Sequence, residues 1–166
     1  MWYNALPRYL GQAESSEFAP TAVREDFYDR ERLIHCPSAA FPAGAARDSI
    51  AYFSIAMNSK LIRPDSPSTV HMATILRPSA TVAFLENRLP NEQKVHPAQI
   101  DTDLGQPSAY ATRFVLRHQG RGTLSFIDGH VESREGTDVV SEGYAILPQT
   151  SIVWTIDPNT DPNLTY

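Results

Sequence analysis

Hydrophobic and polar positions are patterned most clearly in the middle and later parts of the chain. Residues 80–87, "ATVAFLEN", combine β-branched and aromatic side chains after a Pro-Ser pair, which predicts a β-strand. Residues 111–118, "ATRFVLRH", and the run that begins at Thr123 have a similar character. We therefore expect a β-sheet built mainly from this half of the chain.

The pair Asp128-Gly129 lies between two short apolar-rich runs and predicts a two-residue hairpin, because a type I′ turn needs positive φ at both central positions. The pairs that this register brings opposite each other are Ile127 with His130 and Phe126 with Val131. It also places Leu124, Phe126 and Val131 on one face. A four-residue loop, Gln119–Gly122, then connects residues 111–118 to the hairpin. The expected result is an antiparallel meander near residues 111–134.

The first half of the chain has weaker signals. Residues 2–10 contain aromatics and a proline and predict a packed but irregular lead-in. Residues 21–34, "TAVREDFYDRERLI", place apolar side chains at near-helical spacing and predict a short amphipathic helix. The run "IAYFSIAMN" at 50–58 fits either a strand or a buried helical turn, which periodicity cannot distinguish. The predicted loops and irregular excursions are 37–49, 63–68 and 88–107.

Size and composition indicate one globular domain spanning residues 1–166. The predicted short helix and antiparallel sheet place it in the α+β class. The 13 prolines favour short elements over long helices. A formal charge of −5 gives no electrostatic reason to expect nucleic acid as a partner. No stretch approaches the roughly 18 apolar residues of a membrane span, and the single cysteine, Cys36, cannot form an intramolecular disulfide. We expect Cys36 to be a small buried apolar group rather than a nucleophile or a metal ligand.

The stretch "RHQGRGTLSFIDGHVES" raises the question of a catalytic His118/Asp128 pair. In the predicted meander, His118 and Asp128 lie about 16 Å apart at about 3.3 Å per residue, whereas a dyad needs about 2.6–3.2 Å. We therefore interpret His118, Asp128, Gly129 and His130 as structural. His130, beside the turn, is expected to be exposed or a cross-strand partner.

No recognisable catalytic or metal-binding motif is present. A zinc site needs three or four convergent ligands, and the remaining histidines, His35, His71 and His96, show no ligand spacing. Two acidic clusters offer oxygen ligands that suit Ca²⁺, although Asp/Asn/Pro runs are typical of turns. The carboxylates concerned are Asp101, Asp103, Asp157 and Asp161. We expect no catalytic residue, no resident metal and no other cofactor, with Ca²⁺ at these clusters as the open alternative.

The combination of His118, nine intervening residues and Asp128-Gly129 followed by His130-Val131 resembles the H-x9-DG signature of a prepilin-like family of planctomycete and verrucomicrobial bacteria. Further blocks resemble the family in the same order, so that the likeness covers nearly all of the chain. These blocks are "WYNALPRYLG", "LIHCPSA", "YFSIAMNSKL" and "ILRPSATVAFLEN". The family is similar to type II secretion pseudopilins and type IV pilins.

The resemblance implies a pilin-like head on an antiparallel sheet, located in the periplasm or at the cell surface. In this family an N-terminal apolar helix anchors the protein in the inner membrane or packs into a filament. That helix and its cleavage motif are absent here, and we expect a head domain separated from its anchor or a member that has lost it. The implied partners are other pilin-like subunits or secretion components.

The leading hypothesis is a non-enzymatic structural subunit for secretion or filament assembly. One alternative is a surface-displayed module that binds glycans or another ligand through aromatic platforms. The candidate platforms are Trp2, Tyr3, Tyr110 and Trp154. A second alternative is a metal-dependent hydrolase that uses His118, Asp128 and His130.

Overall fold

The computed structural model describes residues 1–18, 25–28, 32–44, 48–61, 70–97, 99–140 and 149–164. Its β-strands are β1 (Ile55–Asn58), β2 (Val82–Glu86), β3 (Ser108–Ala109), β4 (Arg121–Phe126) and β5 (Val131–Glu135). Its α-helices are α1 (Trp2–Tyr9) and α3 (Gly136–Val139). The described residues also contain five 3-10 turns: η1 (Ser15–Phe18), η2 (Glu25–Tyr28), η3 (Ser59–Leu61), η4 (Met72–Thr74) and η5 (Ala111–Arg113). None of the helices among the described residues has the length and apolar character needed to cross a membrane.

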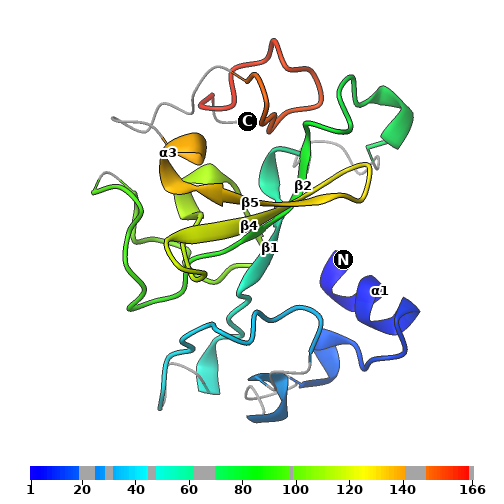
Figure 1. Cartoon of the computed structure of the whole chain (residues 1–166). Coiled ribbons are helices and arrows are strands. Elements are labelled where there is room, and N and C mark those ends of the chain that lie inside the picture. The colour runs from blue at the N-terminus through cyan, green and yellow to red at the C-terminus, as the bar shows by residue number, and fades with distance from the viewer. Residues whose placement is uncertain are drawn as a thin grey trace.

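The five strands form one sheet in the order β3-β1-β2-β4-β5. Figure 1 labels β1, β2, β4 and β5 of this sheet. The pairs β1–β2, β2–β4 and β4–β5 are antiparallel, whereas the two-residue strand β3 runs parallel to β1. The architecture is therefore α+β with few helices. The expectation of a wholly antiparallel sheet is wrong at β3, where the end of the irregular excursion, residues 88–107, runs into the sheet edge beside β1.

The predicted hairpin at Asp128-Gly129 is present, but its register differs by one residue. Ser125 pairs with Val131, and the backbone N–H of Phe126 donates to the carbonyl of His130 at 2.9 Å. The loop therefore contains three residues, 127–129, with Gly129 alone at positive φ (94°). This corresponds to a type I turn followed by a left-handed glycine rather than a type I′ turn. Because a one-residue shift moves a side chain to the other face, Val131 lies opposite Ser125. The prediction placed it opposite Phe126, on the same face as Leu124.

The first segment of the predicted meander, residues 111–118, does not form a regular strand. Residues 111–118 begin with η5 and then run extended, with isolated bridges from Phe114 to Asn87 and from His118 to Arg121. The neighbour of β4 on that side is β2 instead. The loop is also shorter than predicted, since Gln119 and Gly120 both have positive φ (52° and 78°) and make a two-residue turn of type I′ character.

Some of the other elements predicted from the hydrophobic pattern are confirmed and others are not. Residues 80–87 form β2 as predicted, and the strand alternative is confirmed for the end of 50–58, where β1 lies. Residues 2–10 are not irregular, because α1 continues through Pro7 to Tyr9. Gly11 follows the helix, and its positive φ (74°) permits the closing turn. Of the predicted helix 21–34, the structure shows the 3-10 turn η2, and much of the remainder lies outside the described residues. All of the predicted loop 63–68 also lies outside them, as do residues 45–47 of the loop 37–49.

Two apolar clusters hold the described residues together. The first packs against one face of the sheet and includes Leu85, Leu124 and the fully buried Trp154. The second joins aromatic residues of the N-terminal segments, with Phe27 and Phe53 at its centre. In Figure 1 the N-terminal segments, blue to cyan, lie at one end of the sheet, and the red C-terminal segment lies at the other.

Gly122 of β4 is required by close packing. A Cβ atom there would clash with the carbonyl oxygen of Val115 and the ring of Phe114. We expect Gly122→Ala to lower the free energy of unfolding by about 1–3 kcal/mol, the usual range for overpacking. Urea denaturation measures this. Ser125→Ala, on the same strand, serves as the control and should change stability by about 0.5 kcal/mol or less; equal effects of the two substitutions would contradict this packing.

Candidate functional site

Three side chains that are far apart in the sequence meet on the face of the sheet opposite Leu85 and Leu124. They are Cys36, Glu86 and His118. The Nε2 atom of His118 lies 2.9 Å from Oε1 of Glu86 and 3.5 Å from Sγ of Cys36. The three ligand-type atoms all lie within 4.8 Å of one another. Among the described residues, this is the one group of three or more His, Cys, Asp or Glu side chains that converges in this way.

Local structure positions each of the three side chains. Glu86 is the last residue of β2, opposite Ile55 of β1. His118 directly precedes the Gln119-Gly120 turn, and its backbone exchanges hydrogen bonds of 2.9 and 3.0 Å with Arg121. The backbone N–H of Cys36 donates to Oγ of Ser54 at 2.6 Å, which holds the Cys36 loop against the segment that leads into β1.

The hydrogen bonds of Glu86 fix the orientation of its carboxylate. The side chain is 5% exposed. Its second oxygen, Oε2, accepts a 2.9 Å hydrogen bond from the backbone N–H of Thr123, and the guanidinium of Arg117 lies 3.8 Å from Oε1. A buried carboxylate needs such partners because burial disfavours its charged form.

The contacts of His118 do not form a catalytic relay. In a nucleophile–His–acid triad, one ring nitrogen faces the nucleophile and the other faces the acid. Here the same nitrogen, Nε2, contacts both Cys36 and Glu86. Burial also raises the pKa of the Cys36 thiol, and the Glu86 carboxylate raises that pKa further. An activated thiolate requires a lowered pKa, so the raised pKa does not favour Cys36 as a nucleophile. The three side chains instead converge on a common point.

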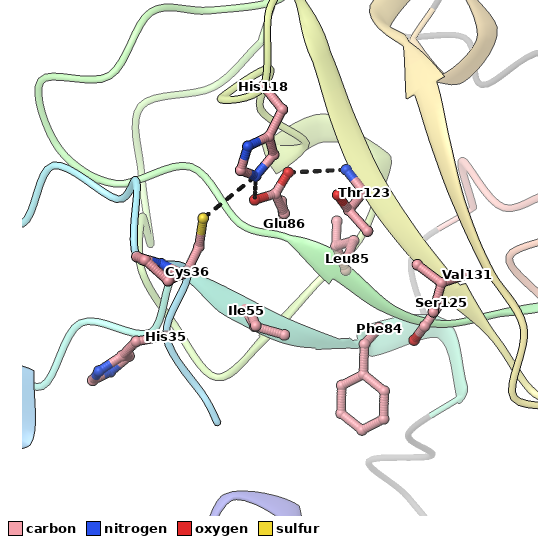
Figure 2. Close-up of a pocket in the computed structure, with 11 residues that line it drawn as sticks. His35, Cys36, Ile55, Phe84, Leu85, Glu86, His118, Thr123, Ser125 and Val131 are labelled. Atoms are coloured by element: carbon pink, nitrogen blue, oxygen red, sulfur yellow. Dashed lines mark hydrogen bonds and ion pairs between the residues drawn. The ribbon is translucent and has the colours of Figure 1, made fainter. Parts of the chain in front are cut away.

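A pocket of about 290 Å³ opens beside these three residues (Figure 2). Its wall is largely apolar and includes Ile55, Phe84 and Val131, with Thr123 and Ser125 from β4. In Figure 2 the contacts from Cys36 and Glu86 meet at one nitrogen of the His118 ring. The side chain of His118 is 44% exposed, so the cluster is accessible from solvent.

The two halves of the H-x9-DG motif lie beyond opposite ends of β4, as the hairpin predicts. Nδ1 of His130 lies 2.6 Å from the Asp128 carboxylate, and the His130 ring stacks on Phe126 at 4.3 Å between centroids. The structure therefore brings His130 together with Asp128, and it places His118 with Glu86 and Cys36. It does not assemble His118, Asp128 and His130 into one centre, which removes the geometric basis of the hydrolase alternative on these residues.

The predicted calcium-type carboxylates are engaged in local contacts. Asp157 and Asp161 each accept two hydrogen bonds from the asparagine two residues later, through its backbone N–H and its side-chain amide. Asp101 pairs with Lys94 and Arg88, which lower its pKa, with the Lys94 hydrogen bond as the larger cause. Asp103 pairs with Arg113 at 3.4 Å. These contacts are turn chemistry and surface ion pairing.

The candidate aromatic platforms pack inward to different degrees. Trp154 is fully buried, which excludes it as a stacking surface. Trp2 is partly buried, donates from Nε1 to the carbonyl of Pro107 at 2.8 Å, and lies 5.1 Å from Phe84 between ring centroids. The Tyr3 ring packs on Phe53 with 5.2 Å between ring centroids. The Lys60 ammonium lies over the Tyr110 ring, 4.6 Å from its centroid.

Cys36 is buried as predicted, but its contact with His118 was not predicted, because 82 positions separate the two residues. Glu86 was not singled out at all. A usable signal was nevertheless present. Each of the three side chains belongs to a different sequence block on which the family resemblance rests: "LIHCPSA", "ILRPSATVAFLEN" and the H-x9-DG stretch.

A search of the chain against protein-family models, curated proteins and solved structures gives no match. The functional conclusion therefore rests on the site geometry and on the sequence.

The Asp128–His130 contact has a measurable consequence. The His130 side chain holds the pKa of the Asp128 carboxyl below its usual range, and the His130 backbone N–H contributes in the same direction. A lowered folded-state pKa contributes stability above the unfolded-state pKa, and that contribution is lost as pH falls through the folded-state value. We expect His130→Ala to raise the pKa of Asp128, as measured by NMR titration of the carboxyl carbon. An unchanged pKa would show that the contact does not exist in solution.

Proposed function

We propose that this chain is a non-enzymatic structural subunit, the extracytoplasmic head domain of a pseudopilin or pilin-like protein. It acts in secretion or filament assembly through contacts with other pilin-like subunits or secretion components. In this proposal the head lies in the periplasm or at the cell surface, and a longer form of the protein carries the inner-membrane helix.

One observation carries the proposal. The residues of the H-x9-DG motif, the most specific part of the family resemblance, are used in two separate junctions of the fold. His118 joins the end of β2 to the Cys36 loop, and Asp128-Gly129 with His130 forms the corner between β4 and β5. A motif divided in this way supports a role in building the head rather than in transforming a substrate.

The sheet edge offers a surface for such contacts. β5 is the last strand beside β4 among the described residues, and an edge strand is a place where another chain can pair with the sheet. Val131 on this strand is 62% exposed. In the proposal, this edge and the nearby turn face neighbouring subunits.

The test uses the full-length gene product in its source bacterium. A photo-crosslinking residue at Val131 is compared with one at Met72, which is similarly exposed (66%) on a different part of the surface. We expect the protein in the envelope fraction, sensitive to protease added outside the inner membrane, with crosslinks to pilin-like subunits from position 131. A cytosolic protein, or identical crosslinking from both positions, would contradict the proposal.

A further inference from the structure

We propose that Cys36, Glu86 and His118 form a binding site for one Zn²⁺ ion. The inference does not depend on the pilin-like role, since it rests on the geometry of three donor atoms. In this proposal, the pocket is the opening through which the ion and solvent reach the three ligands.

The positions of the donor atoms match what a zinc ion requires. Zinc lies about 2.3 Å from sulfur, about 2.0–2.1 Å from nitrogen and about 2.0–2.2 Å from oxygen, so tetrahedral ligands are about 3.3–3.6 Å apart. The Cys36 sulfur and the His118 nitrogen already lie 3.5 Å apart. The nitrogen and the Glu86 oxygen, at 2.9 Å, need only a small opening to admit the ion.

The chemistry of the donors selects the class of metal. A thiolate, an imidazole and a carboxylate suit zinc, whereas Ca²⁺ and Mg²⁺ prefer sites made of oxygen alone. The charges also balance, because a Cys36 thiolate and the Glu86 carboxylate together neutralise a divalent cation. The imidazole of His118, with its single donor nitrogen directed at the cluster, completes a three-ligand set.

The surroundings support the ligand set. The N–H of Thr123 holds the second oxygen of Glu86, which leaves Oε1 directed at the cluster. Such outer contacts orient metal ligands, and losing one typically weakens metal affinity by about 10- to 100-fold. The partly exposed side of His118 provides the entry path, and the adjoining pocket has room for a water molecule as the fourth ligand.

The site would connect three distant parts of the chain: the Cys36 loop, the end of β2 and the turn before β4. Because the ion binds the folded protein and not an unfolded chain whose ligands are dispersed, it stabilises the fold by mass action. Zinc at about 100 times its Kd should raise Tm by about 5–10 °C for a chain of this size.

The first experiment titrates Co²⁺, a spectroscopic substitute for zinc, into the tag-free, reduced wild-type chain. Cys36 is the only cysteine, so a thiolate-to-cobalt charge-transfer band identifies that ligand without any substitution. We expect the band to saturate at one ion per chain and to disappear when Zn²⁺ is added. Absence of the band, or saturation without it, overturns the proposal.

The second experiment measures Zn²⁺ affinity by competition with a chromophoric chelator. Cys36→Ser and His118→Gln should each weaken binding by more than about 100-fold, because losing a ligand exceeds the 10- to 100-fold effect of losing an outer contact. His71→Gln, an exposed histidine away from the pocket, is the matched control and should bind as the wild type does. Circular dichroism checks that each variant is folded.

The corner at Asp128-Gly129 is the alternative location for the zinc ion, and the same series of variants tests it. Asp128→Asn should leave zinc affinity unchanged, since Asp128 lies at the other end of β4. Wild-type affinity in folded His118→Gln, or a loss of binding in folded Asp128→Asn, overturns the assignment. If no ligand variant folds, the cobalt spectrum of the wild type decides by itself.

Discussion

Replacing Arg117 with methionine is expected to lower the free energy of unfolding by about 3–5 kcal/mol, the range for breaking a buried ion pair from one side. The Arg117 side chain is 3% exposed, and its guanidinium makes a two-bond fork with the Glu92 carboxylate at 2.6 and 2.7 Å. It also donates to the carbonyls of Ser54 and Asn87 at 3.0 and 2.6 Å. Methionine fills a similar volume but leaves the Glu92 carboxylate, 9% exposed, without its cation.

The measurement is urea denaturation at neutral pH, with the midpoint and the slope reported separately. Arg121→Met is the matched control, because Arg121 pairs with Glu135 where the side chains are 41% and 62% exposed. Exposed pairs contribute about 0–1 kcal/mol. Adding Glu92→Gln to Arg117→Met should recover part of the loss. Equal effects of Arg117→Met and Arg121→Met would show that the Arg117 network is not formed in solution.

Truncating Trp154 to alanine is expected to lower the free energy of unfolding by about 3–5 kcal/mol, as is usual for a buried aromatic. The Trp154 ring is fully buried in the sheet core, and its carbonyl accepts a 2.8 Å hydrogen bond from the Asn58 side chain. The adjacent residue, Val153, exchanges backbone hydrogen bonds of 2.8 and 2.9 Å with Ala80 and Val82. The C-terminal segment is thus part of the core and not a loose extension.

Trp2→Ala is the comparison for Trp154→Ala, because Trp2 is the other tryptophan and is only partly buried. Its loss should cost less and should affect mainly the docking of α1 on Phe53 and Phe84. Thermal melts followed by circular dichroism compare the two variants with the wild type. A smaller effect at Trp154 than at Trp2 would contradict the burial described for the C-terminal segment.

Local sequence signals predicted the elements that depend on nearby residues. The strand at 80–87 and the corner at Asp128-Gly129 were predicted because alternation and turn residues act over a few positions. The exact loop type was missed, since Asp-Gly is compatible both with a type I′ turn and with a type I turn followed by a left-handed glycine. Helix α1 was missed because Pro7 indicates irregular backbone, although α1 tolerates it.

Local sequence patterns could not predict which side chains meet at the candidate site, because their meeting depends on long-range packing. Sequence proximity directed attention to His118 and Asp128, which the hairpin keeps apart. The actual partners of His118 are 32 and 82 positions away. Placing Glu86 beside His118 requires knowing that β2 pairs with β4, and placing Cys36 requires its hydrogen bond to Ser54. Neither is encoded in a local pattern.

The most direct test of the divided motif is a pair of double-mutant cycles on the metal-free protein, measured as free energies of unfolding. His118→Ala with Glu86→Gln should be coupled by about 0.5–3 kcal/mol, as expected for residues in contact. His118→Ala with Asp128→Ala should be additive within about 0.3–0.5 kcal/mol, as expected for distant sites. Coupling between His118 and Asp128, with additivity between His118 and Glu86, would contradict the arrangement of the motif described above.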